Sequence, residues 1–113
     1  MELLEIEDKL VYQKDGHFVG HIDYHEEEDS SVYINYFQIY KEYQTFGLGS
    51  EMLKEMISYF RENGFKTIKL EAIPMESSMS ITTLISFYMK AGFDYMFRGT
   101  NYLKLDLNIE SFR

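Results

Sequence analysis

The chain has 113 residues, 45% hydrophobic and 27% charged, a balance typical of a compact folded domain and not of a disordered or fibrous chain. It has no cysteine, which excludes a thiol nucleophile, a disulfide framework and cysteine-ligated zinc or iron–sulfur sites. Its 11 basic and 19 acidic residues give a net charge of -8, which opposes attraction to nucleic acid or to an anionic membrane.

The first part of the chain predicts three strands. Residues 9–14 and 17–25 are rich in β-forming residues and flank Asp15-Gly16, a dipeptide that tolerates the positive φ angles of a type I′ turn, so we expect an antiparallel hairpin. Residues 32–40 carry β-branched and aromatic side chains on both alternating faces, as is typical of a central strand buried on both sides.

An amphipathic helix is predicted from Leu48. Apolar residues recur every four positions at Leu48, Met52, Met56 and Phe60, and charged residues occupy the opposite side. The helix should end at Asn63-Gly64, because glycine accepts the left-handed conformation that follows a helix.

A strand at residues 67–73, a helix from about 79 to 91 and two closing strands near 94–97 and 102–107 complete the pattern. In the first of these strands Lys69 and Glu71 share one face, so we expect that face to be only partly covered. The helix has Ser77 or Ser78 as its expected N-cap and an apolar stripe at Ile81, Leu84, Ile85 and Tyr88.

The order of elements predicts an α+β fold with one mixed, mostly antiparallel sheet and two helices. The single strand–helix–strand crossover implies one parallel pair of strands. We expect residues 1–113 to form one domain, since no repeat or linker interrupts the pattern. No apolar run approaches the roughly 20 residues of a membrane span, and the start of the chain lacks the pattern of a signal peptide. The expected location is the cytoplasm.

The segment Gln44–Ser50 joins the central strand to the first helix and carries two glycines, Gly47 and Gly49. The first turn of a helix has unpaired N–H groups and a partial positive charge, and glycines let an anion approach them. A diphosphate fits such a site. The dinucleotide fingerprint would need a third glycine and the P-loop a Lys-Ser/Thr pair after glycine, so a different phosphate-bearing cofactor is expected.

Gln44, Gly47 and Gly49 resemble the pyrophosphate loop of the GNAT superfamily of acyl-CoA-dependent N-acetyltransferases, which reads Gln/Arg-x-x-Gly-x-Gly/Ala. Tyr88, with Gly92-Phe93 after it, resembles the Tyr-x-x-x-Gly-Phe segment of the same family. The resemblance runs from about residue 32 to 107, and the order of elements predicted above is also the family's order.

The sequence departs from the family in two places. The two helices usually found near the family's N-terminus do not fit before the central strand, so the acceptor side would be open, completed by a second subunit as in a homodimer, or not functional. The Asn that often lies seven residues before the Tyr is Ile81 here, which removes a hydrogen bond commonly made to CoA or the acceptor.

The resemblance implies a role for each matching residue. Main-chain N–H groups of the loop would hold the diphosphate of acetyl-CoA, and the main chain of Ile39 and Tyr40 would pair with its pantetheine arm. Tyr88 would protonate the leaving thiolate, although an aromatic residue on a helical stripe is also a normal core residue. The loop residues expected to bind the cofactor are Gln44, Thr45, Phe46, Gly47, Leu48, Gly49 and Ser50.

Glu71 is our candidate for the base, with a solvated strand residue facing Lys69 as the alternative. His21, Asp23 and His25 share one strand face, which fits either a metal site or an exposed polar face, and we favour the polar face and no metal. The acidic residues 26–29 fit a solvated turn or a surface that attracts a cationic amine.

The expected function is transfer of an acetyl group from acetyl-CoA to a primary amine of a small molecule or a protein. The alternative from another class is a CoA-binding or protein-interaction module that has kept the scaffold and lost turnover.

Overall fold

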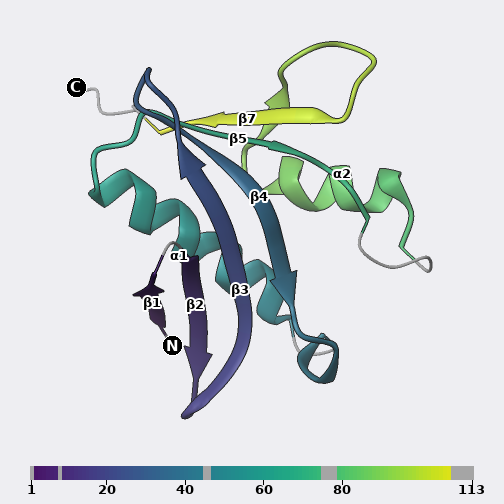
Figure 1. Ribbon diagram of the computed structural model, residues 1–113. Coiled ribbons are helices and arrows are strands. Elements are labelled where there is room, and N and C mark those ends of the chain that lie inside the picture. The colour runs from purple at the N-terminus through teal and green to yellow at the C-terminus, as the bar shows by residue number, and fades with distance from the viewer. Residues whose placement is uncertain (1, 8, 45–46, 75–78, 108–113) are drawn as a thin grey trace.

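The computed structural model describes residues 2–7, 9–44, 47–74 and 79–107, and all structural statements below concern them (Figure 1). They form a seven-stranded sheet, two α-helices and one short 3-10 helix. In chain order the elements are β1 (Glu2–Ile6), β2 (Lys9–Lys14), β3 (His17–Glu26), β4 (Ser31–Ile39), η1 (Lys41–Tyr43), α1 (Leu48–Glu62), β5 (Thr67–Glu71), α2 (Ile81–Lys90), β6 (Asp94–Tyr95) and β7 (Tyr102–Asp106).

The sheet has the strand order β1-β2-β3-β4-β5-β7-β6. Within the described strands β4 and β5 are the one parallel pair, and every other pair is antiparallel. This confirms the predicted fold class. The parallel pair places α1 as the crossover between two neighbouring strands, so the end of β4 and the start of α1 lie close together.

The hairpin prediction is confirmed, since β2 and β3 pair across Asp15 and Gly16, which have φ angles of 53° and 81°. The sequence analysis missed β1, an edge strand that pairs with β2. The turn between β1 and β2 uses Glu7 at a φ of 58° and has no glycine, so the usual hairpin signal is absent.

Helix α1 has the predicted start and end. It buries the predicted apolar stripe, and Gly64 adopts a φ of 87° just after its end. The N–H of Phe65 then donates to the carbonyl oxygen of Phe60 at 3.1 Å, which closes the last turn. The buried side chains of α1 are Leu48, Met52, Leu53, Met56 and Phe60.

Helix α2 begins later than predicted. Its N-cap is Ser80, whose hydroxyl oxygen accepts a hydrogen bond from the N–H of Thr83 at 3.1 Å. The sequence-based choice of Ser77 or Ser78 falls on residues outside the described ranges. Serines close together in the sequence make the N-cap ambiguous, because each has the required side chain. Only the position at which the helix begins identifies the N-cap.

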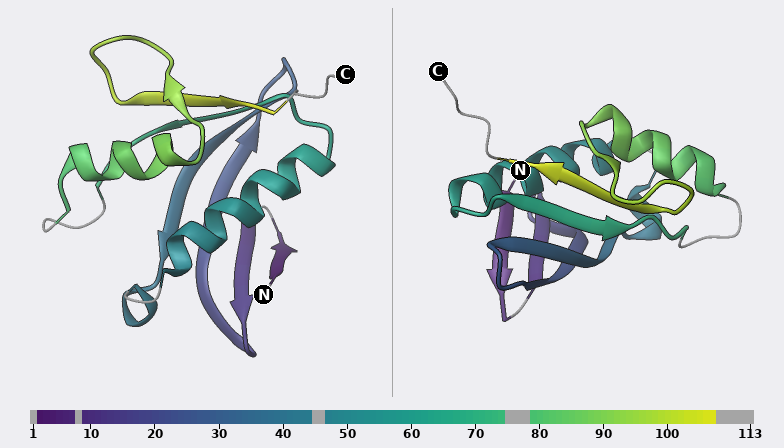
Figure 2. Two further views of the ribbon diagram at one scale, coloured as in Figure 1. Left: turned by 180° about the vertical axis from the view of Figure 1, so that it is seen from behind. Right: turned by 90° about the horizontal axis from the view of Figure 1, so that it is seen from above.

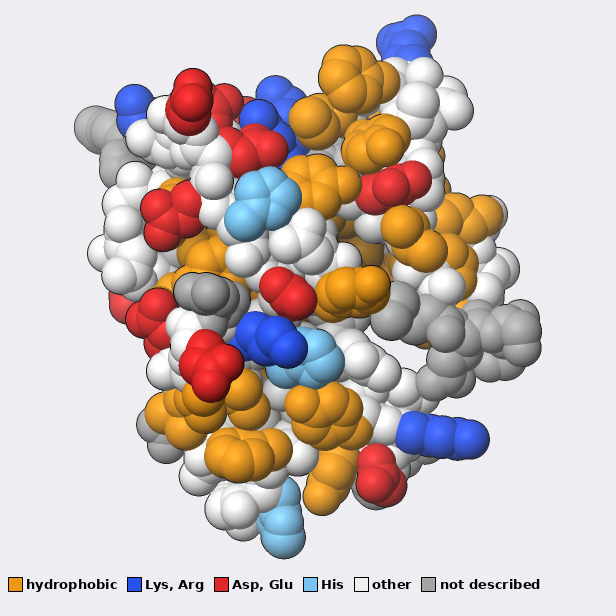
Figure 3. All heavy atoms as spheres, viewed as in Figure 1, with side chains coloured by type: hydrophobic (Ala, Val, Ile, Leu, Met, Phe, Trp, Pro, Cys, Tyr) orange, Lys and Arg blue, Asp and Glu red, His pale blue; other side chains and the backbone are white. Residues whose placement is uncertain are grey.

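Both helices cover the same face of the sheet (Figure 2). We call the other side the open face, because no helix of the described residues covers it. Figure 3 shows this side with hydrophobic, acidic, basic and histidine side chains mixed over it. Among the described residues no helix is long and apolar enough to cross a membrane.

Candidate functional site

Strands β4 and β5 pair along only part of their length. The register runs from Ser31 opposite Thr67 to Ile34 opposite Leu70 and then stops, while β4 continues to Ile39. The two strands diverge beyond that point (Figure 1). The last part of β4 is therefore paired with β3 on one side and has no strand partner on the other.

A cleft of about 310 Å³ lies where the strands separate. One wall comes from the end of β4, a second from α2, and the first turn of α1 closes one end. Most of its surface is apolar, and such lining suits the stem of an extended ligand better than a free ion. The residues that line it are Phe37, Gln38, Ile39, Gln44, Gly49, Ile73, Met79, Thr83, Leu84, Phe87 and Tyr88.

The first turn of α1 is open at this cleft. Its N-cap is Gly47, which adopts the left-handed conformation at a φ of 71° and provides no side-chain cap. The first N–H group bonded within the helix is that of Glu51, which donates to the carbonyl oxygen of Gly47 at 3.4 Å. The N–H groups of Leu48, Gly49 and Ser50 precede it, so they lack partners in the helix and remain able to bind an anion.

The two glycines leave room at this helix start. A Cβ atom built on Gly47 meets no atom within 4 Å, so the space beside the first turn is unfilled. A Cβ atom built on Gly49 would lie 3.6 Å from the ring of Phe87, which is an ordinary van der Waals distance. Gly49 of α1 therefore lies beside Phe87 of α2. Thr45 and Phe46, the other predicted loop residues, lie outside the described ranges.

Main-chain hydrogen bonds separate the roles of Ile39 and Tyr40. The N–H of Tyr40 donates to the carbonyl oxygen of Val19 at 2.8 Å, and the carbonyl oxygen of Tyr40 accepts from the N–H of Tyr43 at 2.8 Å. Both main-chain groups of Tyr40 are thus engaged, and the expectation that they pair with a cofactor arm does not fit them. Because pairing alternates along an antiparallel strand, the N–H of Ile39 points away from β3 and into the cleft.

Gln44 acts through its side chain. Its Nε2 atom donates to the carbonyl oxygen of Ile39 at 2.9 Å, which ties the residue after η1 back to the end of β4. This bond holds Gln44 against the end of β4. Gln44 therefore lines the cleft and also occupies the Ile39 acceptor, so that only the N–H of Ile39 is left to pair with a ligand.

Tyr88 lies on α2 and lines the cleft, although only 5% of it is exposed. Its ring packs against Phe37, Phe87 and Phe93 with ring centroids 5.1–6.1 Å apart. Burial raises the pKa of its hydroxyl, so the phenol stays protonated at neutral pH. Tyr88 is thus a core residue that also lines the cleft.

Glu71 is not among the residues that line the cleft. It ends β5, pairs in register with Tyr102, and alternation places its side chain on the open face, opposite Leu70. On the neighbouring strand, burial of the Tyr33 hydroxyl raises the pKa of Tyr33, and the negative charge of Glu71 raises it further. The structure thus separates the two predicted catalytic residues, with Tyr88 on the helix side of the sheet and Glu71 on the open face.

Lys69, which shares a strand face with Glu71, forms its ion pairs with other residues. Its Nζ atom contacts carboxylate oxygens of Glu27 at 3.2 Å and Asp29 at 3.3 Å. Within the described residues Glu71 has no ion pair.

Two of the histidines of β3 make side-chain hydrogen bonds. His21 Nδ1 lies 3.1 Å from the hydroxyl of Tyr40, and His25 Nδ1 lies 3.2 Å from Nδ2 of Asn35. Burial is the main cause that lowers the pKa of His21. Among the described residues no three His, Asp or Glu side chains gather as metal ligands do.

Sequence reasoning missed part of the cleft wall. Ile73 and Met79 line the cleft and remain 54% and 43% exposed, which is unusual for large apolar side chains. They flank the loop before α2, where no periodic pattern exists. The signal that marks them is an apolar residue outside any helix or strand, and this signal is weak without a structure.

Comparisons with known proteins agree with this geometry. The family model described as "Acetyltransferase (GNAT) family" matches residues 3–93. The ribosomal-protein-S18-alanine N-acetyltransferase from Escherichia coli is similar in structure, with a TM-score of 0.69 and 16% sequence identity over 95% of this chain and 74% of that one. At such identity the likeness shows the shared fold. No curated protein matches the chain in sequence.

Two further solved structures differ in how much of them the chain covers. The GNAT family N-acetyltransferase YhbS from Escherichia coli, solved in complex with CoA, has a TM-score of 0.65 and 17% identity, over 88% of this chain and 58% of that one. The anti-CRISPR protein AcrVA5 has a TM-score of 0.65 and 27% identity, over 85% of this chain and 96% of that one. A protein of nearly the same length therefore has this fold.

Proposed function

Because the chain belongs to the GNAT family of acetyltransferases, we propose that it transfers an acetyl group from acetyl-CoA to a primary amine. The observation that carries the proposal is the cleft between the diverging strands, which runs from the uncapped start of α1 along the free edge of β4 to Tyr88. One end of it suits a diphosphate, and the rest suits the pantetheine arm.

The first turn of α1 supplies the proposed diphosphate site. The N–H groups of residues 48–50 and the positive end of the helix dipole act over a few ångströms, so they attract an anion despite the net charge of -8. The free N–H of Ile39 would donate a hydrogen bond to one carbonyl oxygen of the pantetheine arm, in the manner of an added strand. The proposed cofactor residues are thus Ile39, Gln44 and Gly47 to Ser50.

Tyr88 is the proposed general acid. Its buried phenol is held in the protonated form, and a thiol leaving group has an ordinary pKa of about 8.5 against about 10 for tyrosine. Proton transfer is therefore uphill by at least about 2 kcal/mol, a cost that fixed orientation can offset. Its close packing against Phe37 and Phe93 provides that orientation.

Glu71 is the proposed base, acting from the open face. An alkylamine with a pKa of about 10.4 costs roughly 4 to 5 kcal/mol to deprotonate at pH 7, and a carboxylate acting directly or through water assists this step. The acceptor would approach across the open face while acetyl-CoA occupies the helix side. A face that no helix of the described residues covers favours an amine on a protein chain over a small free amine.

The same proposal includes a protein amine as acceptor, a cytoplasmic location and a second subunit that completes the acceptor side. The ribosomal-protein-S18-alanine N-acetyltransferase is, by its name, a protein of this fold with a protein acceptor, which supports the acceptor class.

The competing candidate is a module that binds CoA without turnover. It is favoured by the bare open face and by Ile81, where the family often has Asn. A thermal shift assay followed by thiol release separates the two candidates. Acetyl-CoA at about 100 times its Kd should stabilise the protein by about 2.7 kcal/mol, whereas adenosine 3′-phosphate, which lacks the diphosphate and the pantetheine arm, should not.

Thiol release with lysine-containing peptides and free amines then tests turnover. Binding with release supports the acetyltransferase. Binding without release across the panel supports the module, and no stabilisation by acetyl-CoA contradicts both candidates.

A further inference from the structure

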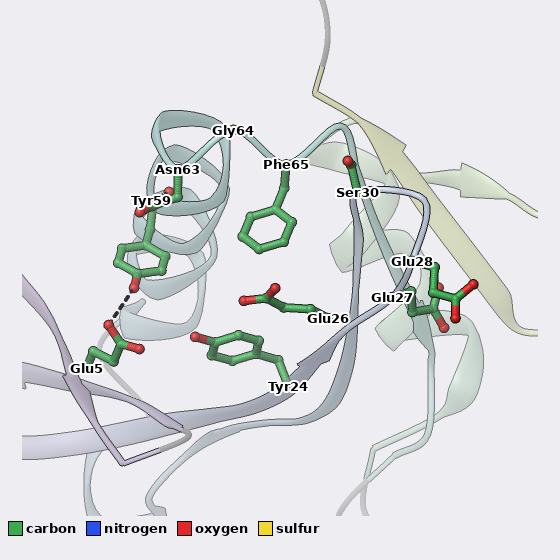
Figure 4. Close-up of a pocket in the computed structure, with 10 residues that line it drawn as sticks. All are labelled: Glu5, Tyr24, Glu26, Glu27, Glu28, Ser30, Tyr59, Asn63, Gly64 and Phe65. Atoms are coloured by element: carbon green, nitrogen blue, oxygen red, sulfur yellow. Dashed lines mark hydrogen bonds between the residues drawn. The ribbon is translucent and has the colours of Figure 1, made fainter.

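A second cavity, of about 430 Å³, lies at the other end of α1 (Figure 4). It is formed where β1, the end of β3, the β3–β4 turn and the last turn of α1 come together. Since α1 has 15 residues and a helix rises about 1.5 Å per residue, roughly 20 Å separates this cavity from the open helix start. The residues that line it are Glu5, Tyr24, Glu26, Glu27, Glu28, Ser30, Tyr59, Asn63, Gly64 and Phe65.

Three aromatic rings form the walls of this cavity, those of Tyr24, Tyr59 and Phe65 (Figure 4). Each of them packs edge-on against Phe60, with centroid distances of 5.0, 5.3 and 5.5 Å. Phe60 is completely buried in the core. The walls are therefore anchored to the core through one shared ring, and the cavity is a built feature of the fold and not a gap between loops.

The carboxylates of Glu5 and Glu26 are directed into the space between these rings (Figure 4). The hydroxyl of Tyr59 donates to Glu5 Oε1 at 3.3 Å. Among the described residues no Lys, Arg or His forms an ion pair with either carboxylate. The cavity thus combines two negative charges without a counter-charge and three aromatic walls.

The neighbouring acidic residues behave differently. Glu27 is ion-paired with Lys69 at 3.2 Å, and both Glu27 and Glu28 point away from the three rings in Figure 4. The charge that faces the cavity therefore comes from Glu5 and Glu26 and not from the whole acidic run. This difference supplies a matched control on the same turn.

The chemistry of the walls selects the kind of cation. A cation near aromatic ring faces is attracted by their negative faces, and a carboxylate adds a charge-assisted hydrogen bond. A metal ion would need more oxygen ligands than two carboxylates among aromatic rings provide. Aromatic rings beside two carboxylates instead match an ammonium or guanidinium group.

We propose that this cavity binds an organic cation through its alkylammonium or guanidinium group, supplied either by a free amine or by a Lys or Arg side chain of a protein partner. The site lies outside the acetyl-transfer cleft, and it exists whether or not the protein is an active acetyltransferase.

The experiment is a titration of the ¹⁵N-labelled protein with n-butylammonium chloride, followed by NMR. The amide signals of Gly64 and Phe65 should shift and saturate, whereas 1-butanol, its neutral counterpart, should leave them in place. Glu26→Gln should weaken the affinity about tenfold, the size expected for one lost hydrogen bond to a charged group. The control variant Glu28→Gln removes the same charge from the same turn and should change the affinity less than twofold.

Two further probes identify the source of the cation. Tighter binding of spermidine than of a lysine-containing peptide supports a free amine, and the reverse order supports a protein side chain. The proposal is overturned if n-butylammonium causes no saturable shift, if 1-butanol shifts the same signals equally, or if Glu28→Gln weakens binding as much as Glu26→Gln. Stabilisation of Glu26→Gln by acetyl-CoA, measured separately, reports only on the cleft.

Discussion

The two ends of helix α1 present opposite chemistry to their surroundings. At its start the main chain is open, because Gly47 provides no side-chain cap and Gly49 in the first turn lines an apolar cleft. At its end the main chain is closed, because the N–H groups of Asn63, Gly64 and Phe65 all donate to carbonyl oxygens of the last turn. The start therefore has main-chain donors without helix partners, whereas at the end the carbonyl oxygens of residues 59–61 are paired.

The start of helix α2, unlike that of α1, has a side-chain cap. The hydroxyl of Ser80 accepts from the N–H of Thr83 and so fills the place that an anion would take. Both helices begin beside the same cleft, but of these two starts only that of α2 has a side-chain cap. An uncapped helix start beside a cleft is thus stronger evidence for an anion site than a helix start alone. The predictions below test whether the missing cap of α1 determines which ligand binds.

The largest expected effect is that of Gly47→Trp. Its indole would stand over the first N–H groups of α1, so affinity for CoA should fall at least about 100-fold, as measured by calorimetry. Gly64→Trp is the matched control, since Gly64 also has a positive φ and no atom within 4 Å of a built Cβ, but lies at the closed end. The strain of a non-glycine residue at positive φ, about 1 to 2 kcal/mol, should destabilise both variants similarly.

The comparison fails if Gly47→Trp keeps the CoA affinity of the original protein, or if Gly64→Trp loses as much. In either case the first turn of α1 would not be the anion site.

A smaller effect is expected at the tyrosines near the two ends. Tyr88→Phe should lower turnover about 100-fold and leave CoA affinity unchanged, because a positioned general acid contributes to the reaction and not to binding. Tyr59→Phe removes a hydroxyl beside the other cavity and should leave turnover within twofold. Thiol release measures turnover and calorimetry measures binding; equal turnover in Tyr88→Phe would leave that residue with a packing role only.

Local patterns in the sequence were sufficient for most of the fold. The four-residue spacing of Leu48 to Phe60 located α1, and Asp15-Gly16 located the first hairpin turn, because both signals depend only on near neighbours. Strand β1 was missed because its turn reaches a positive φ at Glu7, a residue that gives no turn signal. Helix starts among repeated serines depend on tertiary packing, which a local pattern does not contain.

The candidate site could be predicted only where its residues follow one another in sequence. Gly47 and Gly49 were found because a strand-to-helix turn is a local feature. The divergence of β4 from β5 depends on where their pairing stops, after Ile34 and Leu70, and no local pattern reports that register. The cavity at the end of α1 could not be predicted from sequence for the same reason, because Glu5, Tyr24 and Tyr59 come from separate segments of the chain.

The next expected effect concerns stability at the closed end of α1. Nδ2 of Asn63 donates to the carbonyl oxygen of Tyr59 at 2.7 Å, so Asn63→Ala removes one exposed hydrogen bond from the last turn. The free energy of unfolding in urea should fall by about 0.5 to 1 kcal/mol, with CoA affinity unchanged. A loss of CoA affinity would show that the two ends are coupled through the helix, contrary to the separation argued above.

The smallest effect is a change in alkaline sensitivity. Burial is the main cause that raises the pKa of Tyr24 to about 12, and the charges of Tyr59, Glu5 and Glu26 add to it. A folded pKa above the ordinary value of about 10 gives a stability contribution that is complete below pH 10 and is lost as the pH rises through 12. Tyr24→Phe should therefore lose less stability between pH 10 and 12 than the original protein, as measured by urea unfolding at fixed pH.

This titration also tests the charge balance of the cavity. Tetramethylammonium keeps its charge at any pH, so when it lies between Glu5, Glu26 and Tyr24 it should stabilise the phenolate and lower the pKa of Tyr24 toward 10. The absorbance of ionised tyrosine, compared in tetramethylammonium chloride and in sodium chloride of equal ionic strength, measures this shift, and Tyr24→Phe identifies the residue. Identical titrations in the two salts would mean that the rings and carboxylates at this end of α1 hold no organic cation, and the contrast between its two ends would then rest on the open end alone.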